Sequence, residues 1–221
     1  MPITTLDGYI ASAKQRLALL KTASRTSIAA MPFSVFDLAG NPGAGTLAGT
    51  STAAGVVPTD ATAGCPIINA FGGSAGYLSK VEFGNTVASR LRLYDLLFKA
   101  GAYSFNSNVT LSAQPSYAGR VPGGTDFKET ELWIEFVTAS TGTQSVAVTY
   151  TNQDGVTGKT TGTVVTVAGT IGRMFQLPLA AGDTGIQKVE SVVGSVATVG
   201  TFNVLVLRPL WTGRVRIAND G

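Results

Sequence analysis

The residues best suited to chemistry in this chain are carboxylates, and their densest group lies in the segment DFKETELWIEF. That segment holds Asp126, Glu129, Glu131 and Glu135. Glycosidases cleave sugars between two carboxyl groups that are roughly 5 to 9.5 Å apart. Glu131 and Glu135 share one face of a predicted strand, where about 3.3 Å of rise per residue separates them by about 13 Å. That separation suits neither glycosidase arrangement, so the segment predicts no catalytic pair.

Trp133 lies between these two carboxylates on the same predicted strand face. An exposed indole ring in that place could stack on a sugar. A solvated or protein-covered face is the favoured interpretation, because carboxylates on exposed strands are ordinary. Trp133 is therefore a candidate interface residue, with carbohydrate binding as the alternative.

Other catalytic and metal-binding arrangements lack the necessary residues. The chain has no histidine, which excludes Ser-His-Asp and Cys-His catalysis and histidine-based metal sites. Its one cysteine, Cys65, cannot form an internal disulfide and is interpreted as a small buried residue. Asp183 is interpreted as stabilising a turn, because one carboxylate is little support for a calcium site of six to eight oxygens. We expect no enzyme, no cofactor and no metal.

The C-terminal stretch VLRPLWTGRVRIANDG is the one patch that combines basic and aromatic residues. It holds Arg208, Trp211, Arg214 and Arg216, and arginine and tryptophan favour protein interfaces. The net charge is only +3, and lysine and arginine form no run, so nucleic-acid binding is disfavoured. Because the patch follows the last predicted strand, we expect a second docking tail.

Charged residues make up only 13% of the chain, about half the usual share, while hydrophobic residues make up 44%. Two interpretations remain open: other protein chains cover much of the surface, or neutral polar residues solvate it. No apolar run reaches the roughly 20 residues of a membrane helix. The start of the chain, MPITTLDGYIASAKQRLALL, lacks an uninterrupted apolar signal region, so we expect synthesis in the cytoplasm and no membrane partner.

Residues 4–21 show the strongest helical spacing. Tyr9, Leu17 and Leu20 belong to its apolar stripe, and Lys14 and Arg16 lie on the other side. So short a helix is marginal alone. It must dock on its own domain, on a neighbouring copy or on the acidic surface of a partner.

The stretch from Gly40 to Gly64 is made almost entirely of small uncharged residues. It cannot build a core, and a structureless loop of about 25 residues is uncommon in a compact domain. We favour an extended arm that becomes ordered by contact, over a flexible loop. The preceding SVFDL, residues 34–38, is predicted as a short strand.

The remainder reads as a row of strands separated by turns. ELWIEFVTA and QSVAVTYTN alternate apolar and polar residues, Asp154-Gly155 marks a hairpin, and Pro178 marks a strand edge or end. TVASRLRLYD is predicted as a strand and DLLFKAG as a helical turn. We expect a mainly β chain with an antiparallel β-sandwich or jelly-roll-like domain. It divides into a helix and arm, 1–77, and a sandwich with a C-terminal tail, 78–221.

Three segments carry a resemblance to a known class: the hairpin TYTNQDG, the segment GRMFQLPLAAGDTGI and the ending LRPL. They resemble virion structural proteins of tailed bacteriophages, most of all the cement or decoration proteins of phage heads. The resemblance covers the C-terminal half clearly and the N-terminal stretch through NPGAGTLAGT less specifically.

The resemblance implies a β-rich trimer or dimer on the head surface that contacts the major capsid protein through an extended arm. The alternative is a tail, collar or head-fibre component with a carbohydrate- or receptor-binding role. The residues expected at a protein interface are Tyr9, Lys14, Arg16, Leu17, Trp133, Arg208, Trp211, Arg214 and Arg216.

Overall fold

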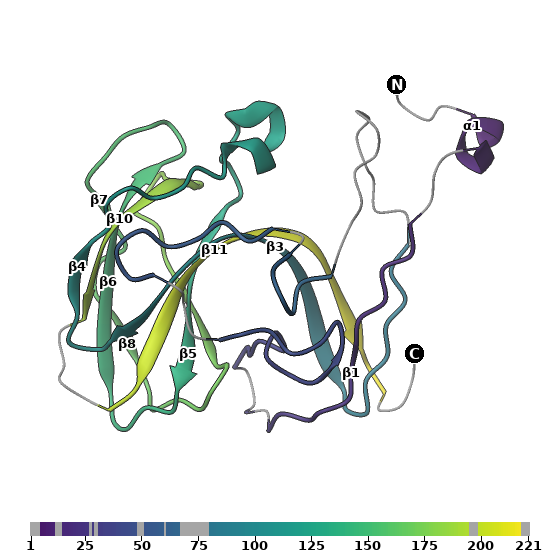
Figure 1. Ribbon diagram of the computed structural model, residues 1–221, viewed down its shortest axis with the longest axis horizontal. Coiled ribbons are helices and arrows are strands. Elements are labelled where there is room, and N and C mark those ends of the chain that lie inside the picture. The colour runs from purple at the N-terminus through teal and green to yellow at the C-terminus, as the bar shows by residue number, and fades with distance from the viewer. Residues whose placement is uncertain are drawn as a thin grey trace.

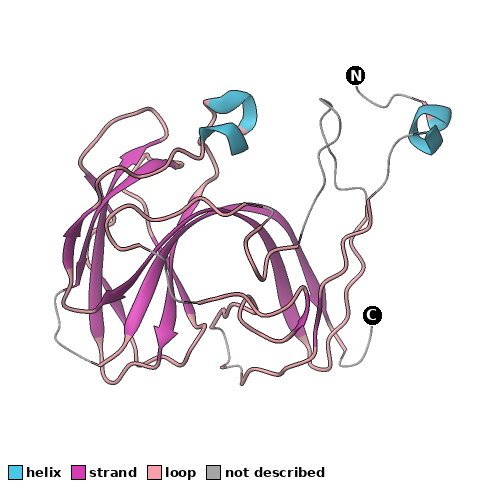
Figure 2. Ribbon diagram, viewed as in Figure 1, coloured by secondary structure: helices cyan, strands magenta, loops and turns pink. Residues whose placement is uncertain are grey.

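The structure, a computed structural model, describes residues 5–11, 15–26, 28, 31–47, 51–59, 61–66, 80–194 and 199–217. Over these residues the chain is mainly β, with two large antiparallel sheets facing each other and a short N-terminal helix that projects to one side (Figures 1 and 2). The expected class, a mainly β chain with an antiparallel sandwich-like domain, is confirmed.

One sheet has the strand order β4-β10-β6-β7, with β8 also paired to β6. Its strands are β4 (Asn108–Thr110), β10 (Ile186–Gly194), β6 (Gln144–Asn152), β7 (Lys159–Thr160) and β8 (Val164–Thr166). The antiparallel pairing of β6 with β7 confirms the hairpin predicted at Asp154-Gly155.

The second sheet has the order β3-β11-β5-β9. Its strands are β3 (Ser89–Ser104), β11 (Thr201–Val215), β5 (Glu131–Thr138) and β9 (Met174–Leu177). Pro178 directly follows the edge strand β9, as predicted. The remaining elements are α1 (Leu6–Ala11), the pair β1 (Leu20–Lys21) and β2 (Gly40–Asn41), and the 3-10 helices η1 (Ala118–Arg120) and η2 (Pro122–Gly124).

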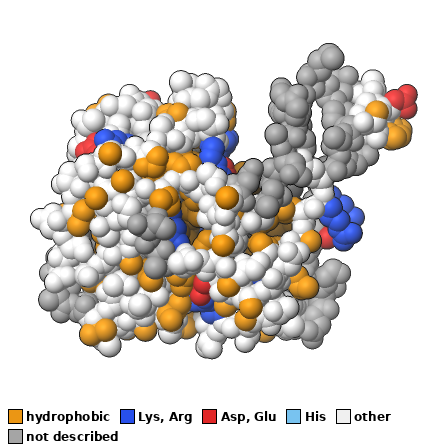
Figure 3. Space-filling view, viewed as in Figure 1, with side chains coloured by type: hydrophobic (Ala, Val, Ile, Leu, Met, Phe, Trp, Pro, Cys, Tyr) orange, Lys and Arg blue, Asp and Glu red, His pale blue; other side chains and the backbone are white. Residues whose placement is uncertain are grey.

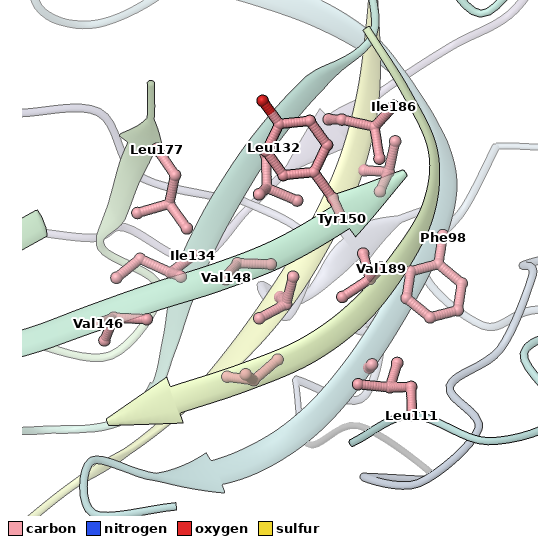
Figure 4. Packing of buried hydrophobic residues seen from close by; sticks show 14 of the residues in the cluster. Phe98, Leu111, Leu132, Ile134, Val146, Val148, Tyr150, Leu177, Ile186 and Val189 are labelled. Atoms are coloured by element: carbon pink, nitrogen blue, oxygen red, sulfur yellow. The ribbon is translucent and has the colours of Figure 1, made fainter. Parts of the chain in front are cut away.

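The hydrophobic core fills the space between the two large sheets (Figure 4). Val146, Val148 and Tyr150 of β6 are fully buried, and so are Leu132 and Ile134 of β5 on the facing sheet. These residues recur at every second position, so the alternation read from the sequence identifies the core face of both strands.

The sequence predictions end two strands too early. In the structure, β3 and β11 pair with each other over almost their whole length. Residues 95–101, predicted as a helical turn, continue β3. Residues 208–215, predicted as a docking tail, continue β11. The run LLFKA fits either periodicity, and the pairing between distant strands decides in favour of the strand.

The N-terminal predictions also change. Of the helix expected over 4–21, α1 covers Leu6–Ala11, residues 15–19 are irregular, and Leu20–Lys21 forms a strand. The strand expected over 34–38 is not formed either, since only the adjacent Phe33 makes a bridge, with Arg173.

The small-residue arm packs on its own domain. We call residues 31–47 and 51–59, which include most of that arm, the strap. Val56 forms an antiparallel bridge with Lys99 on the edge of β3, and Gly101 N–H donates to the Ser51 carbonyl over 3.1 Å. The Tyr103 hydroxyl donates to the Thr52 carbonyl over 2.7 Å. The strap therefore closes one side of the sandwich. The division predicted near residue 78 separates two parts that contact each other.

Candidate protein interface

Glu131, Trp133 and Glu135 share the outer face of β5, as predicted, but other residues of the chain cover that face. Trp133 is 3% exposed and Glu135 is 2% exposed. The Trp133 Nε1–H donates to Glu131 Oε2 over 2.7 Å, and its ring packs edge-on against Tyr94. The expectation that Trp133 offers an accessible surface is wrong, and its ring cannot stack on a sugar.

Glu135 belongs to a buried polar cluster that holds the strap. The Asn203 side-chain amide donates to the Glu135 carboxylate over 3.2 Å and to the carbonyl of Leu47. Lys99 Nζ donates to the Thr46 carbonyl over 2.7 Å. Burial raises the pKa of Glu135 and lowers the pKa of Lys99, and attraction between the two charges opposes both shifts. The partners of this cluster lie in the strap, so we assign it to anchoring that segment.

The C-terminal patch lies on a two-stranded ribbon, where β11 beyond residue 208 pairs only with β3. We call residues 89–94 and 209–216 the arginine ribbon. The antiparallel register places Arg214 directly opposite Arg90, and Thr212 directly opposite Arg92. Sequence reasoning missed Arg90 and Arg92, because only the register of two strands far apart in sequence brings them to Arg214.

The predicted basic and aromatic residues divide between the two faces of the ribbon, because neighbouring strand residues point to opposite faces. Trp211 is opposite Leu93 and packs against Phe83 with ring centroids 5.0 Å apart. Arg214 lies on the other face with Arg90. Arg208 lies at the base of the ribbon, opposite Asp95. Arg216 is exposed beyond the end of β11. The structure therefore does not bring the four C-terminal residues into one patch.

The arginine face of the ribbon borders a pocket of about 410 Å³. The Arg92 guanidinium donates to the Tyr94 hydroxyl over 3.3 Å at its side. Glu131 also lines the pocket and accepts the hydrogen bond from Trp133. Desolvation raises the pKa of the Tyr94 hydroxyl above its ordinary value of 10.0.

No ion pair among the described residues involves Arg90, Arg92, Arg214 or Arg216. The pairs that do form are Arg25 with Asp37, Lys80 with Glu82, Arg120 with Asp95 and Lys159 with Asp183. Charged groups are sparse over the face in Figure 3, where apolar and uncharged polar atoms dominate.

The N-terminal segment, residues 5–20, carries the other candidate residues. Tyr9 is 45% exposed and Leu17 is 42% exposed. Arg16 is exposed and near enough to Glu82 to contribute to a lowered pKa of that carboxyl, whose main cause is its hydrogen bond with Lys80. Lys14 lies outside the described residues.

Both candidate sets lie toward the same side of the molecule, and Arg16 is the N-terminal residue placed near the ribbon. Arg16 lies near Glu82, and Phe83 next to it packs on Trp211 of the ribbon. Figure 1 shows α1 and the ends of β3 and β11 on the same side, away from β4 and β6. No helix in the described parts of the chain is long and apolar enough to cross a membrane.

A second pocket, of about 580 Å³, is lined by Glu129, Glu131 and Asp183 among others. Asp183 accepts hydrogen bonds from the Tyr150 hydroxyl over 2.8 Å and from the Asn152 amide over 2.7 Å. The Asn152 bond is the main cause of its lowered pKa. Within the described ranges, no group of three His, Cys, Asp or Glu residues is placed to hold a metal ion.

Cys65 is half-buried. Burial raises the pKa of its thiol above the ordinary value of 9.0. The thiol is therefore protonated at neutral pH, and a protonated thiol is a poor nucleophile.

Comparison of the chain with protein-family models, with curated proteins and with solved structures finds no match.

Proposed function

We propose that the chain is a structural, non-enzymatic component of a tailed-phage virion, a cement or decoration protein on the outer surface of the head. Its β-rich domain and the resemblance in its C-terminal half support this assignment. Its role is to add contacts between capsid subunits and so stabilise the shell, with the major capsid protein as the partner and copies of itself as neighbours in a trimer or dimer.

The observation that carries the proposal is the exposed apolar surface of the N-terminal segment. Leu6 is 72% exposed and Ile10 is 62% exposed, and the two lie one turn apart on α1. Contiguous exposed apolar side chains mark interaction sites in soluble proteins. In α1 none of the residues is buried against the chain's own sandwich. A segment of this kind gains its burial from another protein.

The alternative is a tail, collar or head-fibre component that binds carbohydrate. It shares the fold, and a fold does not decide a function. Trp133, the residue that suggested sugar stacking, is buried, so that alternative loses its candidate residue.

The proposal is tested by rebinding to particles that lack this chain. The test variant is Leu6→Gln/Ile10→Gln. The control is Val165→Thr/Val167→Thr, which changes two exposed apolar residues, one in β8 and one just after it, far from α1 in Figure 1. We expect wild type and control to bind and the test variant to lose at least about tenfold in affinity, since it removes the apolar anchor. Equal binding by all three proteins, or no binding by wild type, would overturn the proposal.

A further inference from the structure

The arginine ribbon carries an unfavourable arrangement of charge. Arg90 and Arg214 are directly opposite each other on neighbouring strands, where like charges destabilise the pairing. Arg92 lies two residues after Arg90 in β3 and therefore shares its face of the ribbon. No described acidic side chain forms an ion pair with any of the three. The chain therefore places three exposed arginines on one face of the ribbon, two of them directly opposite each other.

The rest of the fold covers only one face of the ribbon, where Trp211 packs on Phe83 and Val215 is buried. Beyond residue 208, β11 has lost its partner β5, so two strands stand without a third. Two-stranded ribbons are marginal in water unless another surface packs against them. A partner on the arginine face would cover the other face of the ribbon and bring negative charge to it.

The residue types indicate the chemistry of that partner. The basic residues of the ribbon are all arginine, whose planar group binds carboxylates through two parallel hydrogen bonds. Arginine is enriched at protein interfaces and lysine is depleted there. The adjoining pocket is lined by the apolar Leu210, by Thr212, whose hydroxyl donates to the Leu91 carbonyl, and by Glu131, its one acidic residue. A chain with a net charge of only +3 lacks the broad basic surface that binds nucleic acid.

We propose that the arginine face formed by Arg90, Arg92 and Arg214 binds a carboxylate-rich segment of a neighbouring protein. The carboxylates pair with the guanidinium groups, and an apolar side chain of the segment enters the pocket beside Leu210. The inference rests on the proposed function only in taking a virion subunit as the natural source of that segment.

The test uses the full chain and a fluorescent poly-glutamate peptide, with fluorescence anisotropy as the readout at low salt. The variant is Arg90→Gln/Arg214→Gln. The control, Lys128→Gln/Lys188→Gln, removes the same charge from exposed positions on the body of the sandwich. An oligothymidylate of similar charge is the second probe.

We expect wild type and control to bind poly-glutamate within about twofold of each other, and the arginine variant to bind at least about tenfold more weakly. The melting temperature of the arginine variant is expected to stay equal or rise, because the opposed charges are gone. Three results would overturn the inference: no binding of poly-glutamate by wild type, equal losses in variant and control, or tighter arginine-dependent binding of oligothymidylate. Because no particle enters this assay, its outcome is independent of the test of the proposed function.

Discussion

Gly55 of the strap lies so close to Phe98 of β3 that a Cβ at residue 55 would overlap the Phe98 ring. Gly45 meets the ring of Phe36 in the same way. These contacts explain why residues 45 and 55 are glycines. At Gly55 the backbone lies directly on β3, and a larger side chain there would hold it away.

The first prediction concerns this close approach. Gly55→Ala should lower the free energy of unfolding by about 3 kcal/mol, because Gly55 has a φ of +67° and its Cβ side is filled. Gly43→Ala is the matched control, since no atom lies within 4 Å of a Cβ there. Urea unfolding measures both variants. Equal stability of the two would mean that the strap is not packed as described.

The second prediction concerns the anchor of the strap. Lys99→Met should cost about 2 kcal/mol, because the Thr46 carbonyl loses its donor and the buried Glu135 loses a nearby cation. Adding Glu135→Gln should recover part of that loss, since both charges are then gone. A double-mutant cycle in urea checks this. Additive losses in the two variants would show that the residues are not coupled.

The third prediction is a pH dependence. Burial raises the pKa of Glu135 above its ordinary value of 4.5, against the opposing effects of Lys99, Ser34 and Asn203, while the charge of Asp37 raises it further. The folded state therefore holds this proton more tightly than the unfolded state. The stabilisation is fully present below a pH of about 4.5, the pKa of this group in the unfolded chain, and is lost as the pH rises through the pKa of the folded state.

Unfolding free energies measured from acid to neutral pH should accordingly fall in wild type relative to Glu135→Gln as pH rises. The glutamine variant keeps the shape of the side chain and cannot titrate. Parallel curves for the two proteins would contradict the burial of an ionisable Glu135.

The fourth prediction separates the two tryptophans. Trp133→Ala should cost about 3 kcal/mol, because the ring is buried in a small apolar cluster with Leu205 and Leu207. Trp211→Ala should cost about 1 kcal/mol, since that ring is only partly covered, by Phe83. Thermal or urea unfolding compares them. A larger loss for Trp211→Ala would reverse the assigned burial.

Local alternation was enough to predict β5 and β6 and their core faces, because the large apolar residues that face the core recur at every second position of each strand. It failed where pairing between distant segments decides the outcome. The run from Leu96 to Ala100 has no alternation, since the core and the strap cover both faces of β3 there. The position of Arg90 opposite Arg214 depends on a register between strands more than a hundred residues apart, which no local pattern contains.

The N-terminal predictions failed for a related reason. Apolar residues from Leu6 to Leu20 suggested one amphipathic helix, yet the structure has a short helix, an irregular segment and a strand paired with Gly40–Asn41. Lys21 Nζ donates to the carbonyls of Leu38 and Pro42, which holds that pairing in place. Tertiary hydrogen bonds of this kind override a weak helical preference.

The most direct test of the account is the copy number of this chain in purified phage particles, measured by quantitative mass spectrometry against the major capsid protein. A ratio near one, or a simple fraction of it, is the result expected of a cement protein that covers the shell. A ratio of a few per cent would place the chain at a vertex, collar or tail and contradict the cement role. Absence from the particle would contradict a virion function altogether.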